Sequence, residues 1–132
     1  IGYGDNANAA LITRGLHEIT KLGIAMGAKE QTFYGLSGIG DLIATCLSTH
    51  SRNRHVGEEI AKGKNLEEII SSMGMIAEGV NTTKVVHELS NKLNIEMPIS
   101  NSVYEVLFLR KDPKTSVKNL MIRKLKNERS LY

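Results

Sequence analysis

The chain has 132 residues, enough for one domain with a buried core and too few for two. Its hydrophobic fraction of 41% and charged fraction of 23% are typical of a soluble globular protein, and no apolar run approaches the length that spans a membrane. Aromatic residues make up 5% with no Trp, which argues against a stacking surface for single-stranded nucleic acid. One Cys and four scattered His do not have the spacing of zinc ligands, so no metal site is predicted.

The single cysteine, Cys46, cannot form an internal disulfide bond. Its apolar neighbours predict a buried thiol, and the absence of a disulfide framework is typical of a reducing compartment. We therefore expect a cytoplasmic protein.

Charge is unevenly distributed along the chain. Residues 110–132 carry eight Lys or Arg against two acids, a net charge of +6, whereas the remainder sums to −3 of the total +3. Such a segment can bind nucleic acid or an anionic membrane. The simpler interpretation, which we prefer, is a solvated last helix followed by a basic, frayed tail over residues 123–132.

The first half of the chain shows helical periodicity. Apolar residues and glycines recur at three- and four-residue spacing from an N-cap at Asp5 to Met26, and the glycines on that face would let another helix approach closely. A short segment over residues 30–35 then leads to a turn at Gly38 and Gly40. The apolar run over residues 42–47 predicts one or two buried helical turns.

Capping signals divide the middle of the chain. Ser51 is placed to cap a helix that ends at Gly63. Asn65 followed three residues later by Glu68 predicts a capping box and another helix. Gly74 breaks that helix, and residues 75–79 are predicted to be a loop or an extended link.

Three further helices are predicted in the last third. The first opens at Val80 and ends at Asn94, the second follows Pro98, and the third starts at Asp112 and Pro113, an N-cap followed by proline at the first helical position. No alternating strand pattern of convincing length and no internal repeat is present. The predicted fold class is all-α, an irregular multi-helix bundle that forms one domain over residues 1–132.

The segment Ser51-Arg52-Asn53-Arg54 has the composition of an anion site. The first N–H groups of a helix lack internal partners and carry partial positive charge, so a helix N-terminus attracts anions. A hydroxyl, an Arg fork and an Asn amide add donors that match the oxygens of a phosphate. The alternative is a serine N-cap followed by surface arginines.

Asp41 also has two interpretations. Between Gly40 and an apolar run, it can cap the helix that follows. A carboxylate held near a phosphate site can instead bond a substrate hydroxyl or orient a catalytic amine. Thr45 lies one helical turn further on the same face and would add a hydroxyl.

Five blocks of sequence together resemble the C-terminal domain of bacterial NAD(P)-dependent glycerol-3-phosphate dehydrogenase. They occur in that family's order and extend from about Gly2 to Met121. The blocks are Gly4-Asp5-Asn6-Ala7 with Ala9 to Gly15, Gly35 to Leu42, Ser51 to Arg54, Ala77-Glu78-Gly79-Val80, and Glu96-Met97-Pro98-Ile99 followed by Val103, Tyr104 and Leu107.

The resemblance implies an enzyme that interconverts glycerol 3-phosphate and dihydroxyacetone phosphate for phospholipid synthesis. It also implies the helical fold of the C-terminal domain of 6-phosphogluconate dehydrogenase-like enzymes. By this resemblance Ser51, Arg52 and Asn53 contact the substrate phosphate, and Asp41 lines the pocket beside the catalytic lysine. Thr45 is included among the substrate-binding candidates.

The same resemblance implies contacts with NAD or NADP from Arg52, Ile76 and Glu78. The N-terminal Rossmann domain of the family, with its glycine-rich phosphate loop, and the general acid/base lysine are not in this sequence. Because the chain opens without methionine in a loop that leads into a helix, we expect a fragment of a larger protein that is inactive when isolated. The expected partners are the missing Rossmann domain and a second subunit in a homodimer, without nucleic acid and without stable membrane insertion.

Three alternatives remain open at this stage. The helical domain of another β-hydroxyacid-type dehydrogenase would share the architecture but carry other substrate residues. A nucleic-acid-binding module would use the basic tail, and its DNA binding would weaken steeply with salt. A purely structural dimerisation domain would use the glycine-bearing face of the first helix.

Overall fold

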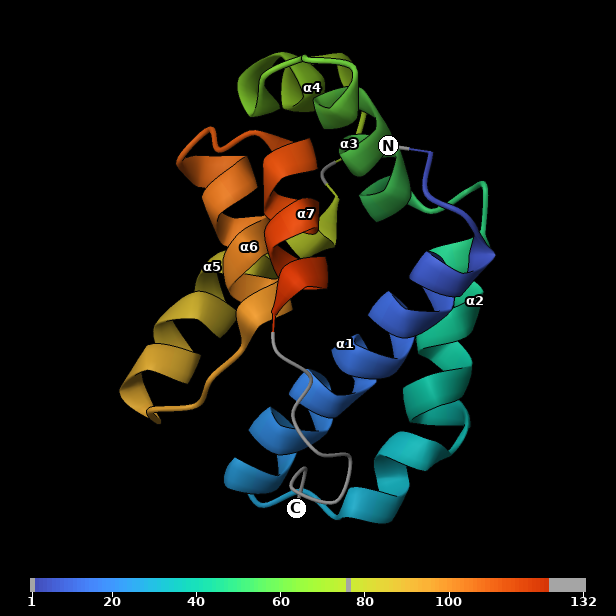
Figure 1. The fold of residues 1–132 in the computed structure, drawn as a ribbon, viewed down its shortest axis with the longest axis vertical. Helices are drawn as coiled ribbons and strands as arrows, with labels where there is room; N and C mark the ends of the chain where they lie inside the picture. The colour runs from blue at the N-terminus through green and yellow to red at the C-terminus, as the bar shows by residue number, and fades with distance from the viewer. Residues whose placement is uncertain (1, 76, 124–132) are drawn as a thin grey trace.

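A computed structural model describes residues 2–75 and 77–123. These residues form seven α-helices, one 3-10 helix and one π-helical turn, with no strand, and confirm the all-α prediction (Figure 1). None of the helices in these two ranges has the length and apolar character needed to cross a membrane. The elements are α1 Asp5–Ala25, η1 Glu30–Tyr34, η2 Leu36–Gly40, α2 Asp41–Leu47, α3 Arg52–Ala61, α4 Leu66–Ser72, α5 Glu78–Lys92, α6 Pro98–Phe108 and α7 Pro113–Ile122.

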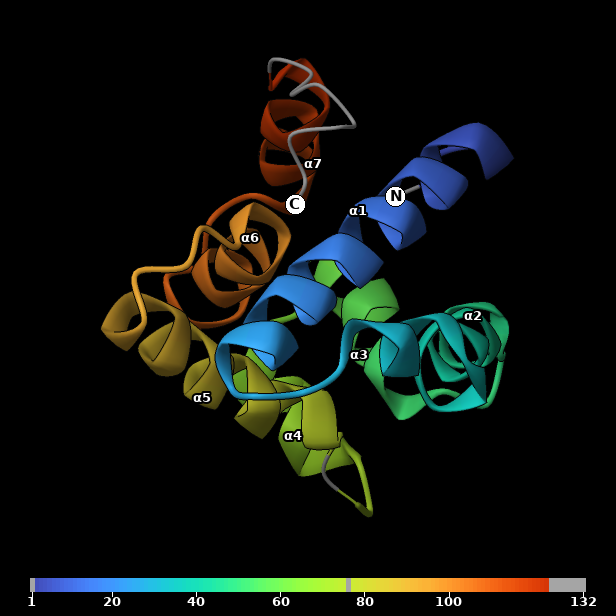
Figure 2. The same ribbon diagram turned by 90° about the horizontal axis from the view of Figure 1, so that it is seen from below.

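Two helices each pack against three other α-helices. Helix α6 packs against α1, α5 and α7, and α3 packs against α4, α5 and α7. Figures 1 and 2 show α1 running between the α5–α6–α7 group on one side and α2 on the other. The helices therefore form an irregular bundle in which α2 is covered along one side only.

The main hydrophobic cluster joins α3, α4 and the beginning of α5. Its members are 0–8% exposed, and partly buried side chains from α3, α4 and α6 pack around them. This cluster holds the N-terminal turn of α5 rigidly against α3. The buried members are Val56, Leu66, Ile69, Ala77 and Val80.

The predicted caps at the start of three helices are confirmed. The side chains of Ser51, Asn65 and Asp112 each accept a hydrogen bond from the backbone N–H three residues later, at 3.3, 2.8 and 2.7 Å. Glu68 completes the predicted capping box by accepting from the N–H of Asn65 at 3.2 Å. Each bond satisfies a donor that the helix itself leaves unpaired.

The predicted C-terminal ends of α3 and α5 are also confirmed, but two predicted helix starts are wrong: α5 begins at Glu78 and not at Val80, and the first helix has a different N-cap. Gly63 and Asn94 have φ values of 94° and 54°, the left-handed conformation that ends α3 and α5. The predicted N-cap at Asp5 is wrong by one position, because Gly4 is the N-cap and Asp5 is the first helical residue. Its carboxylate still lies in the first turn, where the helix dipole favours negative charge.

The segment around Gly38 differs from the prediction. The expected turn is a π-helical turn that continues directly into α2. A Cβ on Gly38 would lie 2.2 Å from the carbonyl oxygen of Phe33, so only glycine permits this close approach.

The predicted burial of α2 is wrong. Ile43 and Leu47 are 41% and 62% exposed, and Cys46 is exposed as well. An apolar run without clear periodicity does not show which side of a helix is covered, and α2 packs on α1 along one side only.

One of the two glycines predicted for a close contact on α1 makes it. A Cβ on Gly23 would lie 2.1 Å from Cζ of Phe33, so the aromatic ring of η1 rests directly on the α1 backbone. Nothing lies within 4 Å of the corresponding position on Gly15. The partner at Gly23 is therefore a short 3-10 segment and not another long helix.

A buried carboxylate joins α1 to α6. Glu18 is 4% exposed, and its two oxygens accept from the N–H groups of Ile99 and Ser100 at 2.6 and 3.0 Å and from the Ser100 hydroxyl at 3.0 Å. The N-cap of α6 is Met97, whose side chain makes no capping bond. Glu18 therefore satisfies the first donors of α6 from a different helix.

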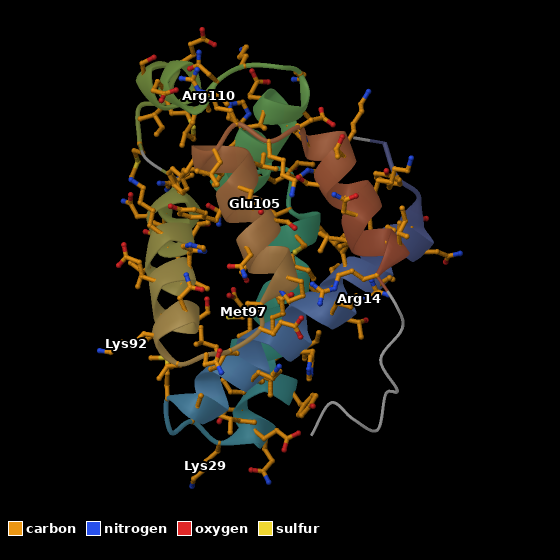
Figure 3. All side chains as sticks on the ribbon, turned by 60° about the vertical axis from the view of Figure 1, so that its left-hand side comes forward. Arg14, Lys29, Lys92, Met97, Glu105 and Arg110 are labelled. Atoms are coloured by element: carbon orange, nitrogen blue, oxygen red, sulfur yellow. The ribbon has the colours of Figure 1, made fainter. Side chains whose placement is uncertain are left out.

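A second contact joins α1 to α7. The Arg14 guanidinium donates to the carbonyl of Leu120 at 3.1 Å, near the C-terminal end of α7. Figure 3 shows Arg14 on α1, pointing toward that helix end. A cation at the C-terminus of a helix is stabilising, because the carbonyls there lack internal partners.

Replacing Glu18 should destabilise the fold. Glu18→Ala leaves two partly buried N–H groups of α6 without an acceptor, so we expect a loss of about 2–4 kcal/mol in the free energy of unfolding. Urea denaturation monitored by circular dichroism measures this change. Glu88→Ala is the matched control, since Glu88 is an exposed acid on α5 and its removal should cost less than about 0.5 kcal/mol. Equal stability of the two variants would contradict the capping role of Glu18.

The acid stability of the chain should depend on Glu59. This side chain is 8% exposed and pairs with Lys62 at 2.7 Å and with Lys64. Hydrogen bonds from Lys62 and then Lys64 lower the pKa of the Glu59 carboxyl from 4.5 to about 2. Because the folded pKa is lower than the unfolded one, the stabilisation is present above pH 4.5 and is lost as the pH falls toward 2. The free energy of unfolding of Glu59→Gln should therefore fall less over this interval, and parallel pH profiles would contradict the prediction.

Candidate functional site

The predicted anion site lies at the N-terminal turn of α3, where three elements meet. Arg52 is the first residue of this helix and Ser51 is its N-cap. The end of α2 and the first turn of α5 are both bonded to this turn. We call Ser51, Arg52 and Asn53 the polar triplet.

Asn53 joins the triplet to the start of α5. Its Oδ1 accepts from the backbone N–H of Gly79 at 3.0 Å, across 26 positions of sequence. The bond satisfies one of the free donors in the first turn of α5 and brings together two of the sequence blocks that carry the family resemblance. Because Oδ1 is occupied, the exposed amide presents its Nδ2 donors to a ligand.

Arg54 has a structural role beside the triplet. Its Nε donates to Glu58 at 2.8 Å, and its Nη1 donates to the carbonyl of Leu47 at 3.1 Å. Leu47 is the last residue of α2, so this guanidinium joins α2 to α3. The Arg54 side chain therefore serves to hold α2 against α3.

Arg52 is the available cation of the triplet. Its side chain is exposed and makes no hydrogen bond or ion pair with any other described residue. Ser51 Oγ accepts the N–H of Arg54 at 3.3 Å, which leaves the hydroxyl proton free to donate. A guanidinium, a hydroxyl and an amide at the positive end of a helix can together bind a dianion such as phosphate.

The capping interpretation of Asp41 is wrong. The preceding residue, Gly40, is already helical with φ −61° and ψ −50°, and no side chain caps α2. The π-helical turn leads into α2 without a break, so there is no free helix start for a carboxylate to cap. The Asp41 side chain is exposed, with no partner in the residues the structure describes, and so is available for a ligand.

The candidates on α2 are Asp41 and Thr45. Their connection to the triplet runs along α2 to its last residue and not through direct hydrogen bonds. Thr45 is half-buried one turn after Asp41, and α2 ends at Leu47, which Arg54 holds. Six residues of α-helix span about 9 Å, so Asp41 lies about that far along the axis from Leu47. Within the described residues, no hydrogen bond joins Asp41 or Thr45 to the triplet.

Of the two remaining cofactor candidates, Glu78 can be placed. It is the exposed first residue of α5, directly before the Gly79 that bonds Asn53, so it lies next to the triplet. Ile76 lies outside the described residues. Sequence reasoning did not find the linking roles of Gly79 and Arg54, because nothing in the local pattern indicates their distant partners.

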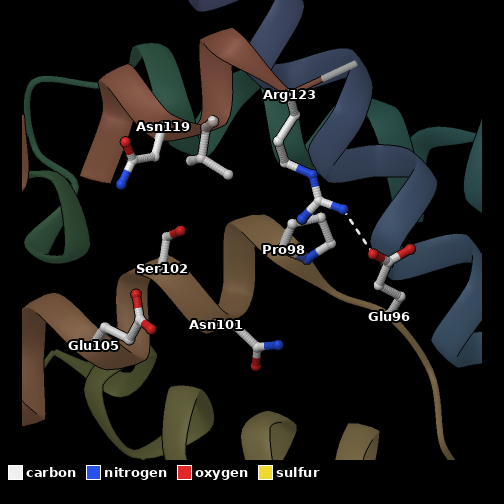
Figure 4. A pocket seen from close by; sticks show the side chains of 8 residues that line it. Glu96, Pro98, Asn101, Ser102, Glu105, Asn119 and Arg123 are labelled. Atoms are coloured by element: carbon white, nitrogen blue, oxygen red, sulfur yellow. Dashed lines mark hydrogen bonds and ion pairs between the residues drawn. The ribbon is translucent and has the colours of Figure 1, made fainter. Parts of the chain in front are cut away.

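Two hollows of the described structure do not include the candidate residues. One, of about 370 Å³, lies between α6 and α7, and its carboxylates are already paired, Glu96 with Arg123 at 2.7 Å and Glu105 with Lys111 at 2.5 Å (Figure 4). The other, of about 300 Å³, lies beside α1 and η1. The candidate site is thus an exposed surface and not a closed pocket.

Alanine substitutions should separate structural from available groups at this site. Ser51→Ala removes a cap and should lower the free energy of unfolding by about 1 kcal/mol. Asp41→Ala removes no described bond and should change it by less than about 0.5 kcal/mol. Thermal or urea unfolding of both variants gives the comparison, and a larger loss for Asp41→Ala would restore the capping interpretation.

Comparison with known proteins supports the resemblance seen in the sequence. The sequence profile described as "NAD-dependent glycerol-3-phosphate dehydrogenase C-terminus" matches residues 1–118. A glycerol-3-phosphate dehydrogenase [NAD(P)+] of Listeria monocytogenes serotype 4a is 55% identical over all 132 residues, and one of Chlorobium chlorochromatii is 58% identical over 129 residues, 98% of the chain. The chain spans only 39% of the length of either relative.

A solved structure agrees with these matches. The crystal structure of glycerol-3-phosphate dehydrogenase from Coxiella burnetii superposes on 91% of this chain and 37% of its own, with a TM-score of 0.87 and 42% identity. The chain belongs to the family of NAD-dependent glycerol-3-phosphate dehydrogenase C-terminal domains.

Proposed function

We propose that this chain is the substrate-binding domain of an enzyme that interconverts sn-glycerol 3-phosphate and dihydroxyacetone phosphate with NAD(P). One observation carries the proposal. At the start of α3, Arg52 is free of described partners, whereas Arg54 two positions later bonds Glu58 and Leu47. An unpaired guanidinium beside a hydroxyl and an amide is the donor set that a phosphate requires.

In this proposal the polar triplet binds the phosphate of the substrate. Arg52 donates two parallel hydrogen bonds to the phosphate oxygens, and the Ser51 hydroxyl and Asn53 Nδ2 donate to the remaining oxygens. The positive end of α3 adds favourable electrostatic potential. Binding the phosphate at a fixed point positions the rest of the three-carbon substrate for reaction.

Asp41 serves the reacting end of the substrate. The enzyme must remove a proton from an alcohol in one direction and return it in the other, and a carboxylate can orient the group that does so. Asp41 has no structural partner among the described residues, so its charge is available for this task. Thr45 adds a hydroxyl one turn away.

A bound nicotinamide cofactor would supply the hydride chemistry of the reaction. The residues present fit contact with such a group, because an unpaired guanidinium at Arg52 and an exposed carboxylate at Glu78 lie on adjoining helix starts. Arg52 can donate to cofactor phosphate oxygens, and Glu78 can accept from a hydroxyl or amide. Ile76, the third candidate for NAD or NADP contact, lies outside the described residues.

The rest of the active site belongs to the proposed N-terminal domain. A Rossmann domain would hold most of the cofactor and supply the general acid/base lysine, which explains why the candidate residues here lie on an open surface. We place residues 1–132 in one substrate-binding domain that is inactive alone. We also propose a cytoplasmic homodimer acting in phospholipid synthesis. Exposed apolar side chains such as Leu36, 91% exposed, are available for interdomain or subunit contacts.

The ion pairs of the basic C-terminal segment support the enzyme over a nucleic-acid-binding module. Arg123 pairs with Glu96 and Lys111 with Glu105, at 2.7 and 2.5 Å. Cations that are already paired with acids contribute less to binding the phosphate backbone of a nucleic acid than the net charge of the segment suggests. The part of the tail after Arg123 lies outside the described residues.

Replacing Arg52 by Lys tests the proposal in the full-length protein. Lysine keeps the charge but loses the planar fork, so we expect kcat/KM for glycerol 3-phosphate to fall by about tenfold to a hundredfold. Arg110→Lys is the matched control. Arg110 is an exposed arginine that lies 3.8 Å from Glu67 and is not one of the candidate site residues, so its replacement should leave kcat/KM unchanged. Unchanged kinetics in Arg52→Lys and Arg52→Ala together would remove Arg52 from the site.

A further inference from the structure

We propose that Gly79 is a positioning residue that orients the Asn53 amide for phosphate binding. This inference rests on the proposed function, in which Asn53 donates to the substrate phosphate. Gly79 acts in two ways: its N–H selects which end of the amide faces the protein, and its missing side chain leaves the space that the amide occupies.

The first contribution is a matter of polarity. An Asn side chain ends in an acceptor at one side and a donor at the other, and rotation about its last bond exchanges them. The Gly79 N–H requires an acceptor, so it holds Oδ1 toward α5 at 3.0 Å. Nδ2 then points away from this bond, toward a ligand. In the opposite orientation, Oδ1 would face the phosphate and repel it.

The second contribution is steric. A Cβ on Gly79 would lie 2.7 Å from Oδ1, 2.8 Å from Cγ and 2.9 Å from Nδ2 of Asn53. These distances are nearly equal, so the flat face of the amide rests directly over the Gly79 Cα. Contacts this short do not occur with a real side chain, and any substitution at Gly79 must displace the amide.

Backbone conformation does not explain the glycine. The described glycines with positive φ are Gly2, Gly27 and Gly63, so Gly79 adopts a conformation that other residues can adopt. Alanine is the better helix former, by about 1 kcal/mol in a helix interior. The amide of Asn53 is therefore the structural reason for a glycine at this position.

The structure also indicates which partner moves when a side chain is added. The backbone on either side of Gly79 is held by Ala77 and Val80, which are 1% and 5% exposed in the hydrophobic cluster. Asn53 is exposed, and its side chain can rotate into solvent. Gly79→Ala should therefore leave the fold nearly unchanged and displace the amide of Asn53.

The test uses the 132-residue chain, ¹⁵N-labelled, titrated with glycerol 3-phosphate and followed by NMR. In the unmodified chain, the side-chain NH₂ signals of Asn53 should shift together with the backbone amides of the triplet. In Gly79→Ala the Asn53 side-chain shift should disappear, and the apparent Kd should rise by about tenfold. Gly57→Ala is the matched control, since nothing lies within 4 Å of a Cβ on this α3 glycine, and it should bind like the unmodified chain.

Asn53→Asp separates the inference from the proposed function. The aspartate keeps an acceptor for the Gly79 N–H but turns an oxygen and a negative charge toward the ligand, so stability should hold while binding is lost. Normal binding by Gly79→Ala alongside lost binding by Asn53→Asp would overturn the positioning role and leave the phosphate site standing. Unchanged binding in both Asn53→Asp and Arg52→Ala would overturn the phosphate site itself.

A measurement that leaves Gly79 in place keeps the inference testable if Gly79→Ala fails to fold. Removing the acceptor in Asn53→Ala should accelerate hydrogen exchange of the Gly79 amide at least several-fold, because the amide then opens to solvent. Arg52→Ala, which removes no bond to α5, should leave that rate unchanged. Equal Gly79 exchange in Asn53→Ala and the unmodified chain would show that the bond does not hold the amide, and would overturn the proposal.

Discussion

The bonds from the Glu18 carboxylate to the start of α6 hold the bundle together. A buried carboxylate is costly unless its oxygens are satisfied, and the first N–H groups of a helix are costly unless they find acceptors. Glu18, Ile99 and Ser100 meet both requirements at once. Because α6 in turn packs on α5 and α7, this contact sets the position of α1 relative to the other half of the molecule.

The candidate site is built on the same principle. Asn53 supplies an acceptor to the first turn of α5, and Arg54 supplies one donor to the end of α2, so the start of α3 becomes the point at which three elements are joined. Among the described residues Arg52 has no partner, although Ser51 and Asn53 on either side of it are bonded, so the fold is held without using this guanidinium.

An exposed donor set on a well-packed backbone is what half of a binding cleft should present. A closed pocket would need its second wall, and the chain spans 39% of the length of its relatives. The hydrophobic cluster under α3 and the start of α5 keeps the backbone that carries the donors in place without that wall. In the proposed function, a fixed backbone would lower the cost of ordering the site when substrate binds.

The sequence by itself determined the features that depend on residues close together along the chain. The side chains of Ser51, Asn65 and Asp112 each accept a hydrogen bond from the N–H three residues later, so both partners of each cap can be predicted from the local sequence. The family blocks predicted the residues of the triplet. The bond from Asn53 to Gly79 spans 26 positions, and the Glu18 contact with Ser100 spans 82. The tertiary structure alone decided these pairings, the exposure of α2 and the absence of any cap at Asp41. Each of these features depends on which faces of the helices pack against each other, and local periodicity does not specify that packing.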